Sequence, residues 1–465
     1  MKNAVTVKCS SFRYSPESEE IFHDLEIQIN YGEVTLISGF SGSGKTTLIS
    51  LMNGIIPRVI QGEFKGEILI DGKSTEGLSM SQISRKAGSV LQNAESQIIH
   101  QIVEDEISFG CENFGFEPSL ISKKIDESCS VMKLEKEWKT RTLSGGQKQR
   151  LVTASTLAMD AGILIFDEPL ANLDVTGAKI LLELLHKLSS SGKAVVLVEH
   201  RLDVVMPYVD KVWKLEDKQA VLVLNKEEYL KSQTDVIQDT KENCIKTDIP
   251  LLKVQDIKKK FGNRQILDGI SFDVNAGERI LLCGENGCGK STLMNIIARL
   301  LKADEGKVES YFTNEKTGKR KSVNSSKKWF KKCGVVYQNP NYQLFMNTVR
   351  NEILYGADDE KYALEVAHRF NLDDLMERHP QSLSEGQKRR VTIAAILAQK
   401  PELLLLDEPT VGQDYSTLKN MMKVINEIHR ETQNTMISVT HDIRCVSALC
   451  DRKIFIKDGK IYEEN

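Results

Sequence analysis

Short apolar runs bounded by polar or glycine-containing turns recur along the whole chain. Residues 1–30 alternate apolar and polar positions, the pattern of a half-buried strand. The runs at 34–37, 88–91 and 195–198 are mostly or wholly apolar, which is typical of strands buried on both faces of a sheet. Residues 211–224 contain a charged turn between two apolar stretches and predict a hairpin.

Helical periodicity separates these strands. Leu48, Leu51 and Met52 follow the first apolar run at the spacing of one helix face. Residues 115–140 carry a second amphipathic period and are predicted to form a small helical insert. Because strands alternate with helices, the pattern predicts a mostly parallel sheet with helices packed on it.

The turn between the strand at 34–37 and its helix has the Walker A spacing G-x-x-x-x-G-K-[ST]. Its glycines let successive backbone N–H groups point at a triphosphate, and the helix N-terminus adds its positive dipole end. A glycine-rich turn that matches by chance is the alternative, but the strand before it and the helix after it favour binding of a nucleoside triphosphate with Mg²⁺. The predicted nucleotide-binding residues are Gly39, Ser41, Gly42, Ser43, Gly44, Lys45, Thr46 and Thr47, with the Thr46 hydroxyl also on the metal.

The same series of motifs occurs a second time. Lys290 follows Lys45 by 245 positions, the LSGGQ segment at 143–147 recurs as LSEGQ at 383–387, and the later motifs recur 240 or 241 positions on. Such order at a nearly constant offset indicates a duplicated nucleotide-binding domain. The second phosphate loop comprises Gly284, Asn286, Gly287, Cys288, Gly289, Lys290, Ser291 and Thr292. We expect a first domain over 1–228, a linker over 229–249 and a second domain over 250–465.

Two acidic pairs follow apolar strands, Asp167 with Glu168 and Asp407 with Glu408. A carboxylate at such a strand end can hold magnesium. We expect this role of the two aspartates, with Ser291 also on the metal in the second copy. A carboxylate one residue later can orient and partly deprotonate the water that attacks the γ-phosphate, the role expected of the glutamates. Such pairs also occur by chance, but their place behind a phosphate loop favours the catalytic interpretation.

Further polar and aromatic residues stand at matching places in both copies. Gln92 and Gln338 are expected to contact the metal or the attacking water, and His200 and His441 the γ-phosphate. A lone histidine after a strand is usually unremarkable, but here it recurs at about the same distance beyond the acidic pair of each copy. Tyr14 and Phe261 can stack on an adenine ring, although each is also explained as an ordinary aromatic at a strand end.

Composition narrows the class of protein. The 465 residues are 40% hydrophobic and 27% charged, as in an ordinary globular protein of more than one domain. A net charge of −3 argues against nucleic-acid binding through bulk charge, and no apolar run approaches the roughly 18 residues of a spanning helix. The nine scattered cysteines contain no C-x-x-C pair and indicate reduced thiols.

With these motifs the chain resembles a tandem ATP-binding cassette (ABC) ATPase over nearly its whole length. The resemblance implies two P-loop domains, each with a mostly parallel sheet, an antiparallel β part and a helical subdomain. It also implies that the halves pair head to tail within one chain, so that each ATP contacts one half's phosphate loop and the other half's signature. The signature residues implied are Ser144, Gly145, Gly146, Gln147, Ser384, Gly386 and Gln387, and Asp174 and Asp414 resemble D-loop aspartates.

The segments after the two glutamines give a narrower resemblance. QNAESQII at 92–99 and QNPNYQLF at 338–345 are similar to those of energy-coupling factor (ECF) ATPases, as is EHRLD at 199–203. This resemblance implies uptake of a vitamin or a metal ion at the cytoplasmic face of the membrane. The implied partners are a transmembrane coupling protein and a substrate-binding membrane component, with no nucleic acid.

Three other kinds of ABC protein are weighed against this interpretation. Tandem sugar-importer ATPases share the layout, but their second phosphate loop often departs from the motif. Soluble ribosome-associated factors have a long charged helical linker, and chromosome-maintenance ATPases need a coiled coil, whereas this sequence has a short linker and no long heptad run.

One difference between the copies predicts unequal sites. Glu385 stands where the first copy has Gly145. If its carboxylate faced a triphosphate, the like charges would repel each other by roughly 4 kcal/mol at about 4 Å and an effective dielectric near 20. Because solvent and magnesium reduce this repulsion, we expect attenuation at the site that uses the second signature.

Overall fold

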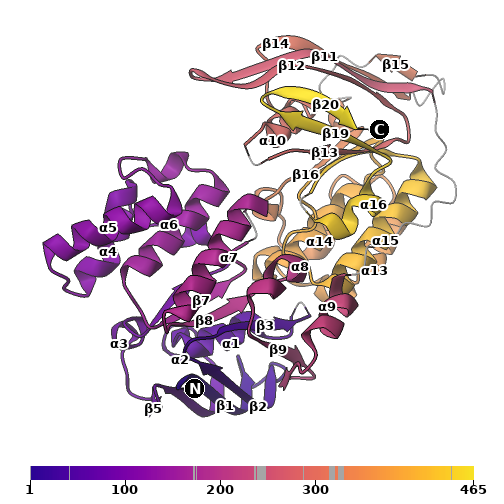
Figure 1. Cartoon of the computed structure of the whole chain (residues 1–465). Helices are drawn as coiled ribbons and strands as arrows, with labels where there is room; N and C mark the ends of the chain where they lie inside the picture. The colour runs from indigo at the N-terminus through magenta and orange to yellow at the C-terminus, as the bar shows by residue number, and fades with distance from the viewer. Residues whose placement is uncertain are drawn as a thin grey trace. The chain divides into compact units, whose positions relative to one another are not determined.

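The computed structural model describes residues 2–40, 42–170, 173, 175–234, 237, 248–285, 287–313, 320–322, 329–440 and 442–464. The chain divides into two compact units, Met1–Thr234 and Asp235–Asn465, and Figure 1 labels the helices and strands of both. The domain boundaries expected at 228 and 250 remain predictions. Four residues named above lie outside the described residues: Ser41, Asp174, Asn286 and His441.

The first unit contains two sheets. The antiparallel sheet has the order β2-β1-β4-β5, formed by β1 (Asn3–Arg13), β2 (Phe22–Asn30), β4 (Glu63–Ile70) and β5 (Lys73–Ser74). The other has the order β10-β9-β3-β8-β7-β6, formed by β3 (Val34–Gly39), β6 (Ala87–Val90), β7 (Ile163–Asp167), β8 (Ala194–Val198), β9 (Lys211–Glu216) and β10 (Gln219–Leu222). Its strands pair in parallel from β9 to β6, and β10 closes the edge as the antiparallel arm of the predicted hairpin.

Helices cover both faces of the parallel sheet. Figure 1 shows α4, α5 and α6 grouped together as a helical part of the first unit. The longer helices are α1 (Lys45–Met52), α4 (Val103–Asn113), α5 (Pro118–Met132), α6 (Gly145–Ala158), α7 (Val175–Ser190) and α9 (Lys226–Thr234). The short ones are α2 (Ile55–Arg58), α3 (Met80–Ser84), η1 (Ala94–Gln97), η2 (Thr140–Thr142), α8 (Leu202–Val205) and η3 (Met206–Tyr208). The helix predicted within 115–140 is α5.

Alternate residues of the central strands enter different hydrophobic cores. On β7, Ile163 and Ile165 pack with α1 and the antiparallel sheet, whereas Leu164 and Phe166 pack with α4 to α7. All four side chains are fully buried. A strand covered on both faces needs apolar residues at every position, which explains the unbroken runs in the sequence.

The second unit repeats this architecture. Its sheets have the orders β12-β11-β14-β15 and β16-β17-β18-β13-β19-β20. The strands are β11 (Pro250–Phe261), β12 (Arg264–Asn275), β13 (Arg279–Cys283), β14 (Glu305–Thr313), β15 (Arg320–Ser322), β16 (Cys333–Val336), β17 (Leu403–Asp407), β18 (Thr435–Val439), β19 (Arg452–Lys457) and β20 (Lys460–Glu464). The helices are α10 (Lys290–Ile297), η4 (Pro340–Tyr342), α12 (Val349–Leu354), α13 (Glu360–Arg369), η5 (Asp373–Leu375), η6 (Pro380–Ser382), α14 (Glu385–Leu397), α15 (Tyr415–Thr432), η7 (Ile443–Cys445) and α16 (Val446–Leu449).

The predicted fold class is thus confirmed twice, with parallel and antiparallel β parts and a helical part in each unit. Each unit has its own two core clusters, and no cluster of the described residues draws members from both units. None of the helices in the described part of the chain is long and apolar enough to cross a membrane.

Candidate functional site: two phosphate loops with buried carboxylates

Both phosphate loops connect a central strand to the helix that follows it. In the first unit the loop runs from the end of β3 into α1, and the Lys45 Nζ donates to the carbonyl oxygens of Gly39 (2.9 Å) and Phe40 (2.8 Å). In the second, the Lys290 Nζ donates to the same two positions, Gly284 (2.7 Å) and Glu285 (2.9 Å). Each ammonium therefore lies inside the curl of its own loop, where the sequence predicts phosphate.

The last glycine of each loop has no room for a side chain. Gly44 has φ +93° as the N-cap of α1, and a Cβ there would lie 2.7 Å from the Phe22 ring. Gly289 has φ +106°, and its Cβ would lie 2.7 Å from a Leu267 methyl. Backbone conformation and packing both demand glycine at this position, independently of any ligand.

The acidic pair of the first unit lies at the end of β7, buried beside the phosphate loop. The Thr46 Oγ1 donates to Asp167 Oδ2 at 3.1 Å. Glu168 has φ +49°, and Glu408 repeats this left-handed conformation with φ +50°. Such a backbone costs roughly 1–3 kcal/mol in a residue other than glycine. The surrounding strand bonds hold it, because the Glu168 N–H bonds Val198 and the Glu408 N–H bonds Val439, both at 2.9 Å.

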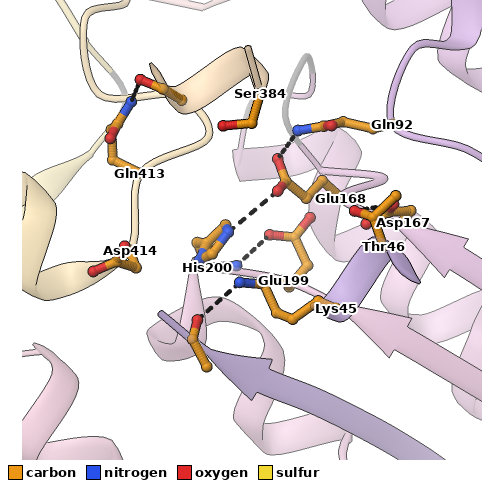
Figure 2. Close-up of polar contacts among 12 residues, drawn as sticks. Lys45, Thr46, Gln92, Asp167, Glu168, Glu199, His200, Ser384, Gln413 and Asp414 are labelled. Atoms are coloured by element: carbon orange, nitrogen blue, oxygen red, sulfur yellow. Dashed lines mark hydrogen bonds and ion pairs between the residues drawn. The ribbon is translucent and has the colours of Figure 1, made fainter. Parts of the chain in front are cut away.

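Figure 2 shows the side chains that converge on Glu168. The His200 Nε2 lies 3.2 Å from Glu168 Oε1, and the Gln92 Nε2 donates to Oε2 at 3.0 Å. Burial by itself raises the pKa of Glu168, but the charge and hydrogen bond of His200, the charge of Lys45 and the bond from Gln92 lower it below its usual range. The carboxylate therefore stays ionised while it is buried.

Asp167 is in the opposite situation. Burial, and next the charge of Glu168, raise its pKa to about 7. Its Oδ1 is buried and has no hydrogen-bond partner among the described residues, and the same holds for Oδ1 of Asp407. A carboxylate oxygen without a partner, next to a threonine hydroxyl, suits Mg²⁺, which prefers oxygen ligands. Thr46 and Asp167 therefore fit the metal that was predicted.

The second unit has the corresponding pair with one additional link. Ser291 hydrogen bonds Asp407, whose pKa is raised chiefly by burial. The guanidinium of Arg389, buried on α14, donates to the backbone oxygens of Glu408 (2.9 Å) and Gln338 (2.6 Å). Sequence spacing does not point to Arg389, because α14 is separated from both acceptors by many residues.

Gln149 takes the place of Arg389 in the first unit. Its side chain is only 1% exposed, and neither its Oε1 nor its Nε2 has a hydrogen-bond partner among the described residues. Arg389 thus bonds the backbone at this position in the second copy, whereas Gln149 makes no such bond to the described residues in the first.

A second residue missed at the sequence level is Glu199. Its buried carboxylate accepts the N–H of Leu170 at 2.7 Å and that of His200 at 3.0 Å, tying the turn after Glu168 to the histidine. In the second unit two buried hydroxyls, Thr410 and Thr440, meet at 2.8 Å instead. Its position in the EHRLD segment was noted, but only the fold shows what the carboxylate binds.

The aromatic and signature residues lie as follows. The Tyr14 hydroxyl meets Thr47 Oγ1 at 2.7 Å while 42% of the residue stays exposed, and Phe261 is 52% exposed. Both rings are accessible, and adenine stacking stays a prediction. Ser144 begins α6 in a capping box with Gln147, and Ser384 begins α14 in the same arrangement with Gln387. These four side chains thus form the helix starts that carry Gly145, Gly146 and Gly386.

The fold and these sites define a protein of the P-loop nucleotide-binding class with the domain present twice. The ABC transporter family profile matches residues 22–171 and 267–411. A "Putative ABC transporter ATP-binding protein" of Treponema denticola is 32% identical over 98% of this chain and 95% of its own length. A "Putative HMP/thiamine import ATP-binding protein YkoD" of Bacillus subtilis is 32% identical over 98% and 90%. The chain therefore belongs to the ABC transporter family.

Solved structures of low sequence identity share the fold. The archaeal ribosome recycling factor aABCE1, solved in complex with the ribosomal stalk protein aP1, has a TM-score of 0.66 at 20% identity, over 98% of this chain and 89% of its own. An "RNase-L Inhibitor" has a TM-score of 0.66 at 19% identity, over 98% and 90%. Family membership implies ATP binding, normally with Mg²⁺, and ATP hydrolysis. The ECF assignment is not shown by these relatives.

Arg389→Gln is expected to weaken the second site specifically. The shorter amide cannot span both carbonyl oxygens, and hydrogen bonds from a charged group contribute about 1.5–3 kcal/mol each. We expect a lower free energy of unfolding of the second unit and slower ATP hydrolysis. The matched control is Arg390→Gln, since among the described residues Arg390 bonds only the backbone of Phe370 and Asn371. Equal loss in both variants would contradict the bracing role.

Gln149→Leu is expected to be neutral or stabilising. The amide makes no hydrogen bond to the described residues, so burying it costs free energy that an apolar side chain of similar size does not. Thermal unfolding of the full chain measures this. A loss of more than about 1 kcal/mol, the typical contribution of one neutral hydrogen bond, would show that the amide has a partner.

Proposed function

We propose that this chain is the ATP-hydrolysing subunit of an ECF-type transporter that takes up a vitamin or a metal ion. It works at the cytoplasmic face of the membrane, held there by a transmembrane coupling protein and a substrate-binding membrane component. The two units close on each other around two ATP molecules, each gripped by one phosphate loop and the other unit's signature.

The residues at each site divide the work of hydrolysis. Lys45 and Lys290 exchange their backbone carbonyls for phosphate oxygens. Glu168, kept ionised by His200, accepts a hydrogen bond from the attacking water and aligns it, as Glu408 does in the second copy. Thr46, Asp167 and Gln92 would hold magnesium in the first copy, and Ser291, Asp407 and Gln338 in the second. When bound, the metal would neutralise charge on the phosphates.

The observation that carries the proposal is a pair of ordered segments after Gln92 and Gln338. In each, the second glutamine of QN-x-x-x-Q folds back on the sheet: Gln97 accepts the Leu91 N–H at 2.8 Å, and Gln343 accepts that of Tyr337 at 2.9 Å. The spacing of the motif is therefore explained by a loop that closes on its own strand. We call residues 93–100 and 339–346 the first and second docking segments.

A buried glutamate of the following helix fixes each docking segment from the other side. Glu106 Oε2 accepts the N–H groups of Ile99 (2.9 Å) and His100 (2.7 Å). Glu352 Oε2 accepts those of Phe345 (3.0 Å) and Met346 (2.9 Å). Both glutamates are nearly inaccessible, so their function is to hold the segment rather than to contact a partner.

Although these hydrogen bonds fix their backbone, the docking segments expose large apolar side chains. Ile99 is 68% exposed, Tyr342 74% and Phe345 63%. The ring of Phe345 packs edge-on against Tyr355, itself 55% exposed. Exposed apolar side chains at matching places, Ile99 in the first docking segment and Phe345 in the second, suit a protein partner with two docking helices.

The alternatives are other ABC importers and, less well supported, a ribosome-associated ATPase. The name of the Bacillus subtilis relative includes HMP/thiamine import, which favours uptake of a vitamin-like substrate. The solved ribosome recycling factor shares the fold at 20% identity, which carries no functional argument.

Replacing the exposed apolar residues is expected to release the membrane partner. Ile99→Asp with Phe345→Asp places charge where an apolar helix would dock, so co-purification from solubilised membranes should fall at least about tenfold. ATP binding should be unchanged. The matched control is Leu224→Asp, since Leu224 is 91% exposed but lies outside both docking segments.

Charge reversal gives a finer test in the first unit. Glu104 is exposed, so Glu104→Lys reports on the partner, whereas Glu106→Lys removes the acceptor of two backbone N–H groups and perturbs the docking segment itself. Co-sedimentation of the chain with ribosomes, and no membrane partner after mild solubilisation, would overturn the proposed function.

We also expect the two units of one chain to close on each other when ATP is bound. Glu168→Gln with Glu408→Gln keeps the shape of both side chains but removes the ionised carboxylates, so ATP should be trapped unhydrolysed. We expect two ATP per chain and a molecular mass of one chain by light scattering. A dimer of the 465-residue chain required for ATP trapping would contradict closure within the chain.

A further inference from the structure

The same lysine has its carboxylate partner on different elements in the two copies. Lys148 and Lys388 each follow the glutamine of the signature and lie in the first turn of α6 and α14. Lys148 forms an ion pair with Glu95, from η1 in the first docking segment. The second copy has Asn341 at the position of Glu95, and it has Glu385 at the position of Gly145.

In the second copy three side chains close a triangle. The Lys388 Nζ lies 3.0 Å from Glu385 Oε1 and 2.9 Å from Asn341 Oδ1. The Asn341 Nδ2 in turn donates to Glu385, with distances of 3.2 Å to Oε1 and 3.4 Å to Oε2. The lysine side chain is 9% exposed and its carboxylate partner 35%. Within the triangle each donor faces an acceptor, and the ammonium faces the carboxylate.

This geometry bears on the attenuation expected from Glu385. Lys388 compensates the charge of its carboxylate within the same helical turn, which weakens the repulsion that a bare carboxylate would exert. Attenuation at this site stays a prediction, and the contacts of the triangle give Glu385 a structural role as well.

We infer that Glu385 is a positioning residue that binds the second signature segment to the second docking segment as one rigid body. In the first copy the carboxylate partner of the lysine belongs to the docking segment, whereas in the second it belongs to the signature helix. Asn341 makes the cross-link there through its amide. A further bond holds the same helix start, because the buried Gln413 Nε2 donates to the Gly386 carbonyl at 2.9 Å.

The consequence is that a displacement of the second docking segment carries Ser384 and Gly386 with it. A use of this link in transport, to pass motion from a docked membrane protein to the signature segment, rests on the proposed function. The mechanical link itself does not.

Hydrogen exchange of the full chain tests the link. The Phe345 and Met346 amides, protected by Glu352, and the Tyr342 and Gln343 amides, bonded within η4, report on the second docking segment. Glu385→Gly leaves Lys388 without a carboxylate, so these amides should exchange about tenfold faster. Adding Asn341→Glu recreates the arrangement of the first copy and should restore the protection. The first docking segment serves as the internal control.

Each result distinguishes a positioning role of Glu385 from an action on the helix dipole alone. If Asn341→Glu does not rescue Glu385→Gly, then Glu385 acts only on the helix dipole and the inference is overturned. Unchanged exchange in Glu385→Gly would overturn it equally. Glu385→Gln, which keeps the shape but not the charge, should behave like Glu385→Gly. The measurement needs no membrane partner, so failure of the proposed function leaves its outcome unaffected.

Discussion

The burial of two adjacent carboxylates beside a phosphate loop is the constraint on which the rest of each unit depends. A carboxylate in a water-poor site must be paired, hydrogen bonded or protonated. In the first unit Glu168 is kept ionised by His200, Gln92 and Lys45, whereas Asp167 lacks a full set of partners. Strands, loops and the glutamate's left-handed backbone all serve to hold this unequal pair in place.

The two copies solve the same mechanical problems with different residues. The Arg389 guanidinium bonds the backbone of Glu408, whereas the Gln149 amide at that position has no partner in the described part of the first copy. Paired hydroxyls stand where Glu199 accepts two backbone N–H groups. The carboxylate beside the signature lysine changes element as well. Both copies keep these structural positions, but the side chains found there and the bonds they make differ.

The sequence predicts local features well and long-range ones poorly. Walker A spacing, apolar strands and helical periods each depend on neighbouring residues, so the phosphate loops, the parallel sheet and α5 followed from pattern alone. Arg389, Glu199 and Gln413 act on backbone atoms far along the chain, which no spacing reveals. The sequence marks Glu385 as a difference between the copies, but its ion pair with Lys388 is seen only in the fold, and the attenuation expected from it stays a prediction. The roles of the site residues toward ATP remain predictions.

Each unit encloses its own pair of hydrophobic cores, and this separation has an evolutionary consequence. A substitution that loosens the packing of one copy leaves the interior of the other untouched. After duplication, changes that compensate for a loosened core can therefore arise within the same half, even though both halves are inherited as one chain. The different braces of the two copies fit such separate adjustment of each interior.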